Sequence, residues 1–491
     1  MKPMPTEGNP HWRSLFSGRA AWNLGWAASG LLLGFLAGDW LASFGVLVLW
    51  GIWRYFSTWP GPPVLPVVLS LQWAQVASGL YFLALTGTPL AVMKECDYRS
   101  VTLLGLVYLV ALAVGLLCGR RAGSRLRARR ARPERLRWKY LVAVYGASFV
   151  GKDLLGRLAW SIPGLTQPLL ALQTFHLVFL YMVFRRLLFG RRWGWVGVVA
   201  ALEIASGFTG FFSEYRAPLQ VLLVVALEGI AARPSLRRYA AFGCGAATLV
   251  FASVLWTGIK DPYRARFRSD EPRTARLARG ADLALDWLAH TDQRFVPTFE
   301  RLVNRVWDVR YHALAFERVP KVVPHENGRL LWDGVRHVLM PRLLFPEKEP
   351  LPSDSLKVRK YSGVWVAGPE SGTSVGFSYV LESYVDFGLP WMYLPLFAYG
   401  ILGGAAFAFL ARRLRGFELR QAVLCALFMT TLDRYEIPWS KVLGGALTRW
   451  VVVGGAALVL EGLLLAYPFL WWRPRRREGS SQRRSHAVDT A

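Results

Sequence analysis

Residues 101–118, VTLLGLVYLVALAVGLLC, decide the fold class of this chain. The run carries no charged side chain and approaches the ~20 apolar residues that an α-helix needs to cross a bilayer core. Similar runs with few or no charges lie at Ala27–Ala37, Trp193–Phe212 and Gly444–Ala466. The sequence therefore predicts an all-α polytopic membrane protein.

The composition agrees with a membrane protein. The 491 residues are 53% hydrophobic, include 22 tryptophans and have a mean hydropathy of +0.28, which is too apolar for an ordinary soluble protein of this length. The first apolar run lacks a short core followed by a small-residue cleavage site, so we interpret it as a retained membrane helix rather than a signal peptide.

We predict about twelve membrane spans. They lie at roughly 20–38, 40–56, 64–87, 101–118, 140–158, 167–185, 193–212, 216–232, 239–258, 391–411, 417–433 and 441–467. The weakest are the first two, which only Asp39 separates, and 140–158, which contains Lys152, Asp153 and Arg157. Those charges leave open a short or partly re-entrant segment at 140–158.

The net charge of +27 lies mainly in short runs between the apolar segments. These basic runs fall within 120–139, 185–192, 233–238, 412–420 and 473–484. With the N-terminus inside, all of them fall on the cytoplasmic side, as the positive-inside rule requires. This distribution argues against a nucleic-acid partner and predicts contact with anionic lipid headgroups.

The spans divide the chain into four parts. They are N-terminal membrane helices (1–258), a large extracytoplasmic loop (259–375), C-terminal membrane helices (376–470) and a basic cytoplasmic tail (471–491). Within the loop, Leu283–Leu288 and Phe299–Tyr311 carry apolar residues at helical spacing. We expect short amphipathic helices there, packed on the outer membrane face.

The sequence carries no signature of a metal site or a nucleotide site. The cysteines Cys96, Cys118, Cys244 and Cys425 lie alone or beside apolar spans, without CxxC or Cys/His spacing. A Walker A loop and a GxGxxG sequence after a strand are both missing. We therefore expect no metal and no cofactor.

Three charged groups fall on the predicted outer side. Glu382 and Asp386 are four residues apart, so on a helix they share one face, suited to acid–base chemistry, cation binding or pairing with arginines. Alternatively, they are acidic residues that a helix N-terminus favours. Arg216 either faces a lumenal cavity or belongs to a polar turn, and Arg434 lies in a turn that could equally be an interfacial aromatic belt.

The histidines offer further candidates. His325 and His337 lie in the predicted outer loop and would titrate near neutrality, although each could equally be a surface or packing residue. His176 lies within an apolar span, where we expect a buried, hydrogen-bonded role.

The segment Met340–Pro352, MPRLLFPEKEPLP, lies in the outer loop and interrupts the apolar pattern with four prolines. Its Pro-Arg and Phe-Pro-Glu-Lys, followed by a Gly-Thr stretch, Glu-x-Tyr-x-Asp-Phe-Gly and a membrane span, resemble bacterial oligosaccharide repeat-unit polymerases, the O-antigen polymerase (Wzy-type) family. The matching residues are Pro341, Arg342, Phe345, Pro346, Lys348, Thr373, Gly376, Glu382, Tyr384, Phe387 and Gly388. Asp386 stands where the family usually has asparagine.

This resemblance implies a metal-independent membrane glycosyltransferase (GT-C-like) of the bacterial inner membrane. It would join undecaprenyl-pyrophosphate-linked oligosaccharides into a surface polysaccharide on the outer face, with membrane lipids, a chain-length regulator and a flippase as candidate partners. The implied catalytic residues are Glu382, Asp386 and Arg342. The implied substrate-binding residues are Arg216, Lys348, Tyr384, Arg434 and His337. The general base stays open among Glu382, Asp386, a histidine or none.

Three other functions stay open at this point. An O-antigen ligase-like transferase shares the lipid-linked donor and the basic site but uses another acceptor. A lipid-linked oligosaccharide flippase would place charges through a central cavity and carry an internal repeat, which we do not find by inspection. A non-catalytic scaffold in a polysaccharide assembly complex is the third.

Overall fold

A computed structural model describes most of the chain. The described residues are 20–467 and 471–472, except 58, 60, 125–134, 163, 209–215, 233–234, 267–271, 308, 341, 343, 346, 350 and 372–373.

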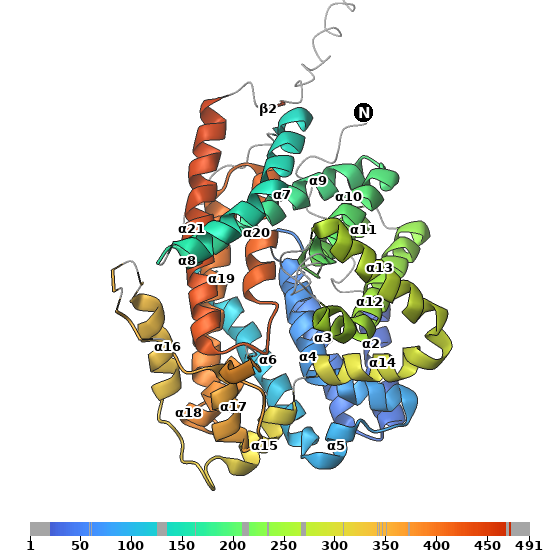
Figure 1. The fold of residues 1–491 in the computed structure, drawn as a ribbon, viewed down its shortest axis with the longest axis vertical. Helices are drawn as coiled ribbons and strands as arrows, with labels where there is room; N and C mark the ends of the chain where they lie inside the picture. The colour runs from blue at the N-terminus through green and yellow to red at the C-terminus, as the bar shows by residue number, and fades with distance from the viewer. Residues whose placement is uncertain are drawn as a thin grey trace, which may run out of the picture.

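Helices make up nearly all of the regular structure among these residues (Figure 1). The N-terminal half contains α2 (Ala20–Ala37), α3 (Trp40–Phe56), α4 (Val64–Thr86), α5 (Ala91–Glu95), α6 (Tyr98–Gly123), α7 (Trp138–Ser161), α8 (Thr166–Leu172), α9 (Thr174–Phe189), α10 (Trp193–Phe208), α11 (Arg216–Ala232) and α12 (Leu236–Ala265). Two short strands, β1 (Arg135–Leu136) and β2 (Trp471–Trp472), pair antiparallel.

Shorter helices follow, before the chain returns to long ones. They are α13 (Arg273–Ala289), α14 (Thr291–Val306), α15 (Arg310–Arg318), α16 (Arg329–Leu339), α17 (Asp354–Ser362), the 3₁₀ turn η1 (Pro369–Ser371) and α18 (Tyr379–Phe387). The last three helices are α19 (Tyr393–Arg413), α20 (Phe417–Thr431) and α21 (Trp439–Ala466).

A helix overlaps each of the twelve predicted spans, although residues 209–212 of one span lie outside the described residues. Only six helical segments of the described chain are long and apolar enough to cross a membrane. These six are Val64–Thr86, Tyr98–Gly123, Thr166–Phe189, Leu236–Ala265, Tyr393–Arg413 and Trp439–Leu464. The protein is therefore a helical, membrane-embedded protein. The weak prediction at 140–158 is a continuous helix, α7, and Asp39 begins α3 by accepting a hydrogen bond from Leu41 N at 2.9 Å.

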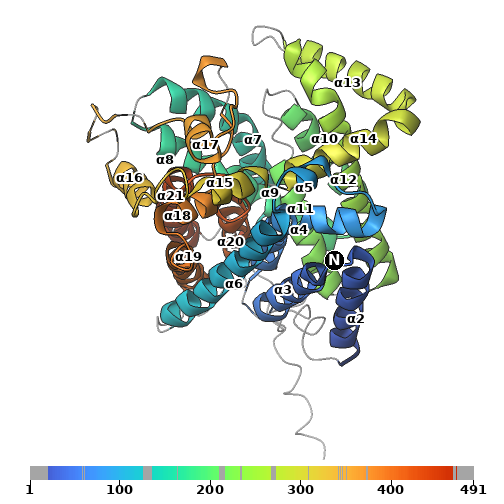
Figure 2. The ribbon, with the colours of Figure 1, turned by 90° about the horizontal axis from the view of Figure 1, so that it is seen from below.

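Residues 101–118, which form most of α6, pack against α19 (Figure 2). A Cβ added to Gly115 or Gly119 would lie 2.3 Å from Phe397 O or 2.0 Å from Ile401 O. Since glycines farther along α6 face residues farther along α19, the two helices run parallel. Small residues that let two backbones meet are the usual contact between membrane helices.

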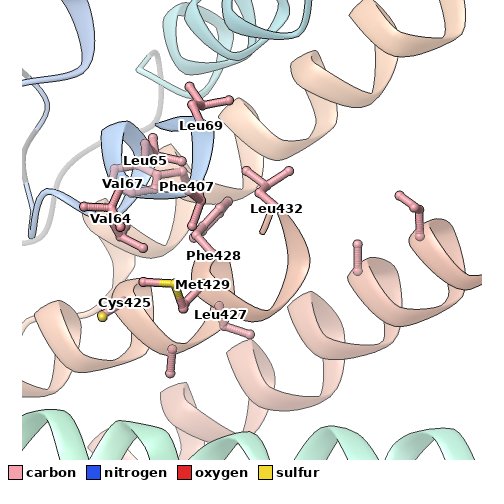
Figure 3. Close-up of a cluster of buried hydrophobic side chains, with 14 of the residues drawn as sticks. Val64, Leu65, Val67, Leu69, Phe407, Cys425, Leu427, Phe428, Met429 and Leu432 are labelled. Atoms are coloured by element: carbon pink, nitrogen blue, oxygen red, sulfur yellow. The ribbon is translucent and has the colours of Figure 1, made fainter. Parts of the chain in front are cut away.

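Apolar side chains from distant segments fill the core beside this crossing. Figure 3 shows Val64 and Leu65 of α4 with Phe407 of α19 and Phe428 of α20. These side chains are at most 1% exposed. Close packing of this kind fixes how the helices approach and so positions the segments at their ends.

The bundle has two different ends. Helices α15–α18 gather at the end where α6 and α19 begin, and β2 lies at the opposite end (Figure 1). Arg120, Arg121, Arg412 and Arg413 close the last turns of α6 and α19 at that opposite end. These four arginines and the charged groups of α16–α18 therefore lie at opposite ends of the parallel pair.

The predicted loop, 259–375, contains five helices, α13–α17, after the end of α12. The helical spacing read over Phe299–Tyr311 does not form one helix, because α14 stops at Val306. The Trp307 indole donates a hydrogen bond to Val76 O at 2.9 Å, and this tertiary contact draws the chain away from the helix axis.

Candidate functional site

The short helix α18 carries the two predicted carboxyl groups. It begins at Ser378, whose hydroxyl accepts a hydrogen bond from Leu381 N at 3.0 Å. Glu382 and Asp386 are each 1% exposed. A buried carboxylate needs hydrogen bonds or a counter-charge, so the partners of each define its role.

Glu382 holds a lysine. One carboxylate oxygen pairs with Nζ of Lys357 on α17, and the other accepts a hydrogen bond from Trp439 N at 2.6 Å. Burial raises the pKa of Glu382 to about 7, although Lys357 acts in the opposite direction. Glu382 thus joins α17, α18 and the start of α21, and it titrates near neutrality.

Asp386 caps another helix. Its two oxygens accept hydrogen bonds from Leu330 N at 3.0 Å and Leu331 N at 2.8 Å, in the first turn of α16. Burial raises the pKa of Asp386 to about 6 despite these bonds. The two carboxyl groups therefore share a helix, as predicted, but they bind different elements.

A cavity of about 190 Å³ lies beside the Glu382–Lys357 pair. It is lined by Arg329, Leu330, Asp333, Gly334, Leu351, Pro352, Leu356, Lys357, Lys360, Tyr361 and Ser440. Three of these side chains are cationic and one is a carboxylate. Glu326 pairs with Arg329 at 2.8 Å and with Lys360, so neighbouring carboxylates hold the cations around the cavity.

The far end of α16 collects cations without a nearby carboxylate partner among the described residues. Lys348 Nζ donates hydrogen bonds to His337 O and to Met340 O, the latter at 2.8 Å, and so caps the helix. Arg342 is exposed and makes no hydrogen bond or ion pair with the described chain. Burial and the neighbouring cations lower the pKa of His337 and of Lys348.

Arg342 is consequently remote from the two carboxyl groups. Asp386 binds the first turn of α16, whereas Arg342 follows the last turn. The helix has 11 residues, so its ends lie about 15 Å apart. The sequence motif predicts that Arg342 and Glu382 belong to one catalytic site, but the structure does not bring them together.

Tyr384 packs rather than facing a cavity. Its hydroxyl donates to Val319 O at 2.8 Å, and its ring centroid lies 4.0 Å from that of Phe316. His325 lies beside it and contacts Val385 O through Nδ1 at 3.2 Å. These residues fasten α18 to the end of α15.

The predicted arginines Arg216 and Arg434 share one carboxylate. Arg216 Nη2 lies 3.8 Å and Arg434 Nε lies 4.0 Å from the oxygens of Asp433. Asp433 is buried, whereas the Arg216 side chain is 46% exposed. Gln75 holds this loop by donating to Asp433 O at 3.1 Å, and the same loop leads to Trp439, the partner of Glu382.

An apolar groove of about 140 Å³ runs along α11. It follows α11 from Leu219, one turn after Arg216, to Ile230, and α9, α10 and α12 form its other walls. Arg238 lies at its far end and donates to Gly229 O at 2.7 Å. Eleven residues of rise make the groove about 16 Å long.

Residues 100–434 match the family described as "Domain of unknown function (DUF8712)". The chain belongs to this family. The family region includes α6 from its third residue, the groove and every predicted site residue, whereas α21 lies beyond it. No curated protein and no solved structure matches the chain.

Several residues of the candidate site were not predicted from the sequence. Lys357, Lys360 and Arg329 line the cavity, and Asp354 at the start of α17 pairs with Lys441 of α21. Ser353-Asp354 is a helix-start signal that places both lysines on the helix that follows. Only the tertiary fold shows that Lys357 pairs with Glu382 and Lys360 with Glu326.

Part of the motif lies outside the described residues: Pro341, Pro346, Thr373 and the segment 213–215. Gly376 is described, and a Cβ there would lie 2.5 Å from Glu436 O. The glycine therefore allows the strand-like segment before α18 to approach the loop that carries Asp433 and Arg434.

Proposed function

We propose that this protein polymerises undecaprenyl-pyrophosphate-linked oligosaccharide repeat units on the outer face of a bacterial cytoplasmic membrane. In this proposal the chain crosses the membrane twelve times, both termini are cytoplasmic, and residues 259–375 lie outside. The arginines that end α6 and α19 lie opposite the α16–α18 groups, which supports this orientation.

One observation carries the proposal: the exposed Arg216 lies one helical turn before Leu219, the first residue of α11 that lines an apolar groove. Arg216 and Arg434 share a single buried carboxylate, so they retain net positive charge. A planar guanidinium suits phosphate oxygens, and the groove that starts one turn later suits an isoprenoid chain. A polyprenyl pyrophosphate has these two chemical parts in this order.

The reaction is a glycosyl transfer. The acceptor hydroxyl oxygen attacks the anomeric carbon of the donor, and the bond from that carbon to the pyrophosphate oxygen breaks with its electron pair. The hydroxyl proton passes to a base, and the lipid pyrophosphate leaves. Cations at the site stabilise the negative charge that develops on the leaving oxygen.

The residues then take distinct roles. Arg216 and Arg434 bind the pyrophosphate, while Lys357 in the cavity binds an oxygen-rich part of the substrate. Glu382 is a positioning residue for Lys357, and its pKa of about 7 suits proton transfer at neutral pH. If the reaction rate changes with pH near pH 7 in the wild type and this change disappears in Glu382→Gln, the proton transfer is assigned to Glu382.

The test is a reaction of the purified protein in nanodiscs with a lipid-linked repeat unit, followed by a gel of the products. We expect a ladder of lengths that Arg216→Ala abolishes. Arg310→Ala is the matched control, because Arg310 is 48% exposed and pairs with Glu95. A folded Arg216→Ala protein that polymerises normally would overturn the proposal, and a single addition to a separate acceptor would indicate the ligase-like alternative.

A lipid-linked oligosaccharide transporter is the second candidate, and one buried network favours it. Glu203 of α10 accepts a hydrogen bond from Tyr145 at 2.6 Å, contacts His176 at 3.1 Å and lies 3.5 Å from Lys152. Ionisable groups inside predicted spans often mark transport paths. Movement of the lipid-linked unit between leaflets of proteoliposomes, lost in Glu203→Gln and without a product ladder, would select this candidate.

A further inference from the structure

The outer face of α16 carries an unusual combination of exposed side chains. Trp332 is 63% exposed, Leu339 is 67% exposed, and Arg336 between them is also exposed. Positions 332, 336 and 339 lie on one face of a helix. The opposite face, which includes Leu330 and Gly334, is buried.

The segment after α16 extends this surface. Leu344 is 70% exposed, and Phe345 and Arg342 are exposed as well. Large apolar side chains exposed together mark an interaction surface. Trp is enriched at the level where a membrane protein meets the headgroups, and Arg near a helix end extends its charge to that level.

The position of α16 in the fold identifies the partner. A Cβ on Gly334 would lie 3.2 Å from Ser440 N, and a Cβ on Gly444 would lie 3.4 Å from Cγ2 of Val338. Residues farther along α16 therefore meet residues farther along α21, so the two helices run side by side in the same direction. Because α21 is one of the membrane-crossing segments, the last turns of α16 descend to the depth at which α21 enters the bilayer.

We propose that the exposed face of α16 and the residues Arg342, Leu344 and Phe345 are seated in the bilayer surface, with the apolar side chains among the acyl chains and the arginines on anionic phospholipid headgroups. The charge fits this partner, since Arg336 and Arg342 have no ion-pair partner among the described residues. Burial lowers the pKa of His337 and of Lys348, and the neighbouring Arg342 adds to both shifts. This membrane contact requires only that α21 spans the membrane, so it does not depend on the glycosyl transfer proposed above.

Spin labels on the full chain in liposomes test whether this face of α16 contacts the bilayer. The free cysteines Cys96, Cys118, Cys244 and Cys425 are replaced by alanine, and single cysteines are introduced as Leu339→Cys, Val322→Cys and Val451→Cys. Val322 lies on a loop at the same end, and Val451 lies on α21; both are exposed in the structure. They serve as the aqueous and the lipid references.

We expect the Leu339 label to collide with oxygen more than with a water-soluble nickel complex, as the Val451 label does. A label at Leu339 as accessible to nickel as the one at Val322 would overturn the proposal. Protection from both reagents together with dipolar coupling between copies would also overturn it, because a second copy would then cover the face.

The lipid headgroup is tested by adding anionic phospholipid to zwitterionic liposomes. Each arginine at an anionic surface shifts such a partition about fivefold, so nickel access at Leu339 should fall. Arg336→Gln together with Arg342→Gln should remove this fall, and an equal response in both proteins would refute the headgroup contact.

A second measurement keeps the native cysteines, in case their replacement disturbs folding. Brominated lipids quench tryptophans that touch acyl chains. Trp332→Phe should remove part of the quenching, whereas Trp365→Phe should not, since Trp365 is exposed on the loop after α17. Equal quenching in wild type and Trp332→Phe would place Trp332 in water and contradict the proposal.

Discussion

The α6–α19 crossing and the α16–α18 end of the bundle are held together in opposite ways. At the crossing, glycines bring two backbones together, and shape alone fits them. In α18, the buried residues include Glu382, Ser383 and Asp386, and each is satisfied by a bond to another element or to its own helix. The stability of the first region should therefore be independent of pH, whereas that of the second should depend on it.

The largest effect is expected at the crossing. Gly119→Val places a branched side chain where Ile401 O lies 2.0 Å from the Cβ position, and backbone cannot move as a side chain can. Overpacking usually costs about 1–3 kcal/mol, and a backbone obstacle should exceed that range. We expect little folded protein by size-exclusion chromatography and a greatly lowered melting temperature in detergent at every pH.

Gly455→Ala is the control for that variant, since nothing lies within 4 Å of its Cβ position. Alanine there should be neutral or stabilise the helix by up to about 1 kcal/mol. A Gly119→Val protein that melts like wild type would mean that the two backbones are not in contact.

Lys357→Met should come next, because it leaves Glu382 buried without its counter-charge. Breaking a buried ion pair costs about 3–5 kcal/mol. At pH 6 the carboxyl can stay protonated, so the loss measured by thermal denaturation should be smaller than at pH 8. Adding Glu382→Gln should restore most of the stability at pH 8; a double variant as unstable as Lys357→Met would rule out the stranded charge as the cause.

The wild-type protein should itself lose stability as pH rises. Burial raises the pKa of Glu382 to about 7 and that of Asp386 to about 6, above their ordinary values near 4, so the folded state binds these protons more tightly than the unfolded state. Their contribution is complete below about pH 4 and is lost as pH rises through 6 and 7. The free energy of unfolding, measured by denaturation across this range, should depend less on pH near pH 7 in Glu382→Gln and near pH 6 in Asp386→Asn. The same pH dependence as in the wild type would contradict these assignments.

Asp386→Ala should have a smaller, local effect. It removes the acceptor for two N–H groups of α16, and loss of such a cap costs about 0.5–2 kcal/mol. Hydrogen exchange should quicken in the first turn of α16 and not in α17. Asp386→Asn, which retains an acceptor, is the control, and equal exchange in both variants would show that the cap is unimportant.

Arg342→Ala should change stability least, because Arg342 is exposed and unbonded within the described chain. A surface substitution usually stays within about 0.5 kcal/mol. Its melting temperature in detergent should match that of the wild type. A clearly lowered melting temperature would mean that Arg342 supports the fold.

The sequence could predict where helices lie, because length and apolar character determine which segments enter a membrane. It could also predict that Glu382 and Asp386 share a helix, since that follows from their spacing. It could not predict that Lys357 binds one and that the Leu330 and Leu331 amides bind the other. Those partners lie on other helices, whose positions depend on loops and on packing. The hydrophobic periodicity of one segment does not encode those positions.

The α6–α19 crossing shows the same limit. Gly115 and Gly119 stand four residues apart in the printed sequence, a spacing that marks a close helix contact in membranes. The partner, with Gly400 and Gly404, is far along the chain, and nothing local distinguishes it from other glycine-bearing spans such as α21. Sequence thus indicates that a contact surface exists without naming what it meets.

The parallel α6–α19 pair also has a consequence for how the protein is made. At typical synthesis rates of about 5–20 residues per second, the ribosome needs between roughly ten seconds and a minute to pass from the end of α6 to α19. During that interval the glycine stripe of α6 sits in the membrane without its partner. Biogenesis of this protein therefore requires something, whether lipid or insertion machinery, to shelter a nascent helix until a late one arrives.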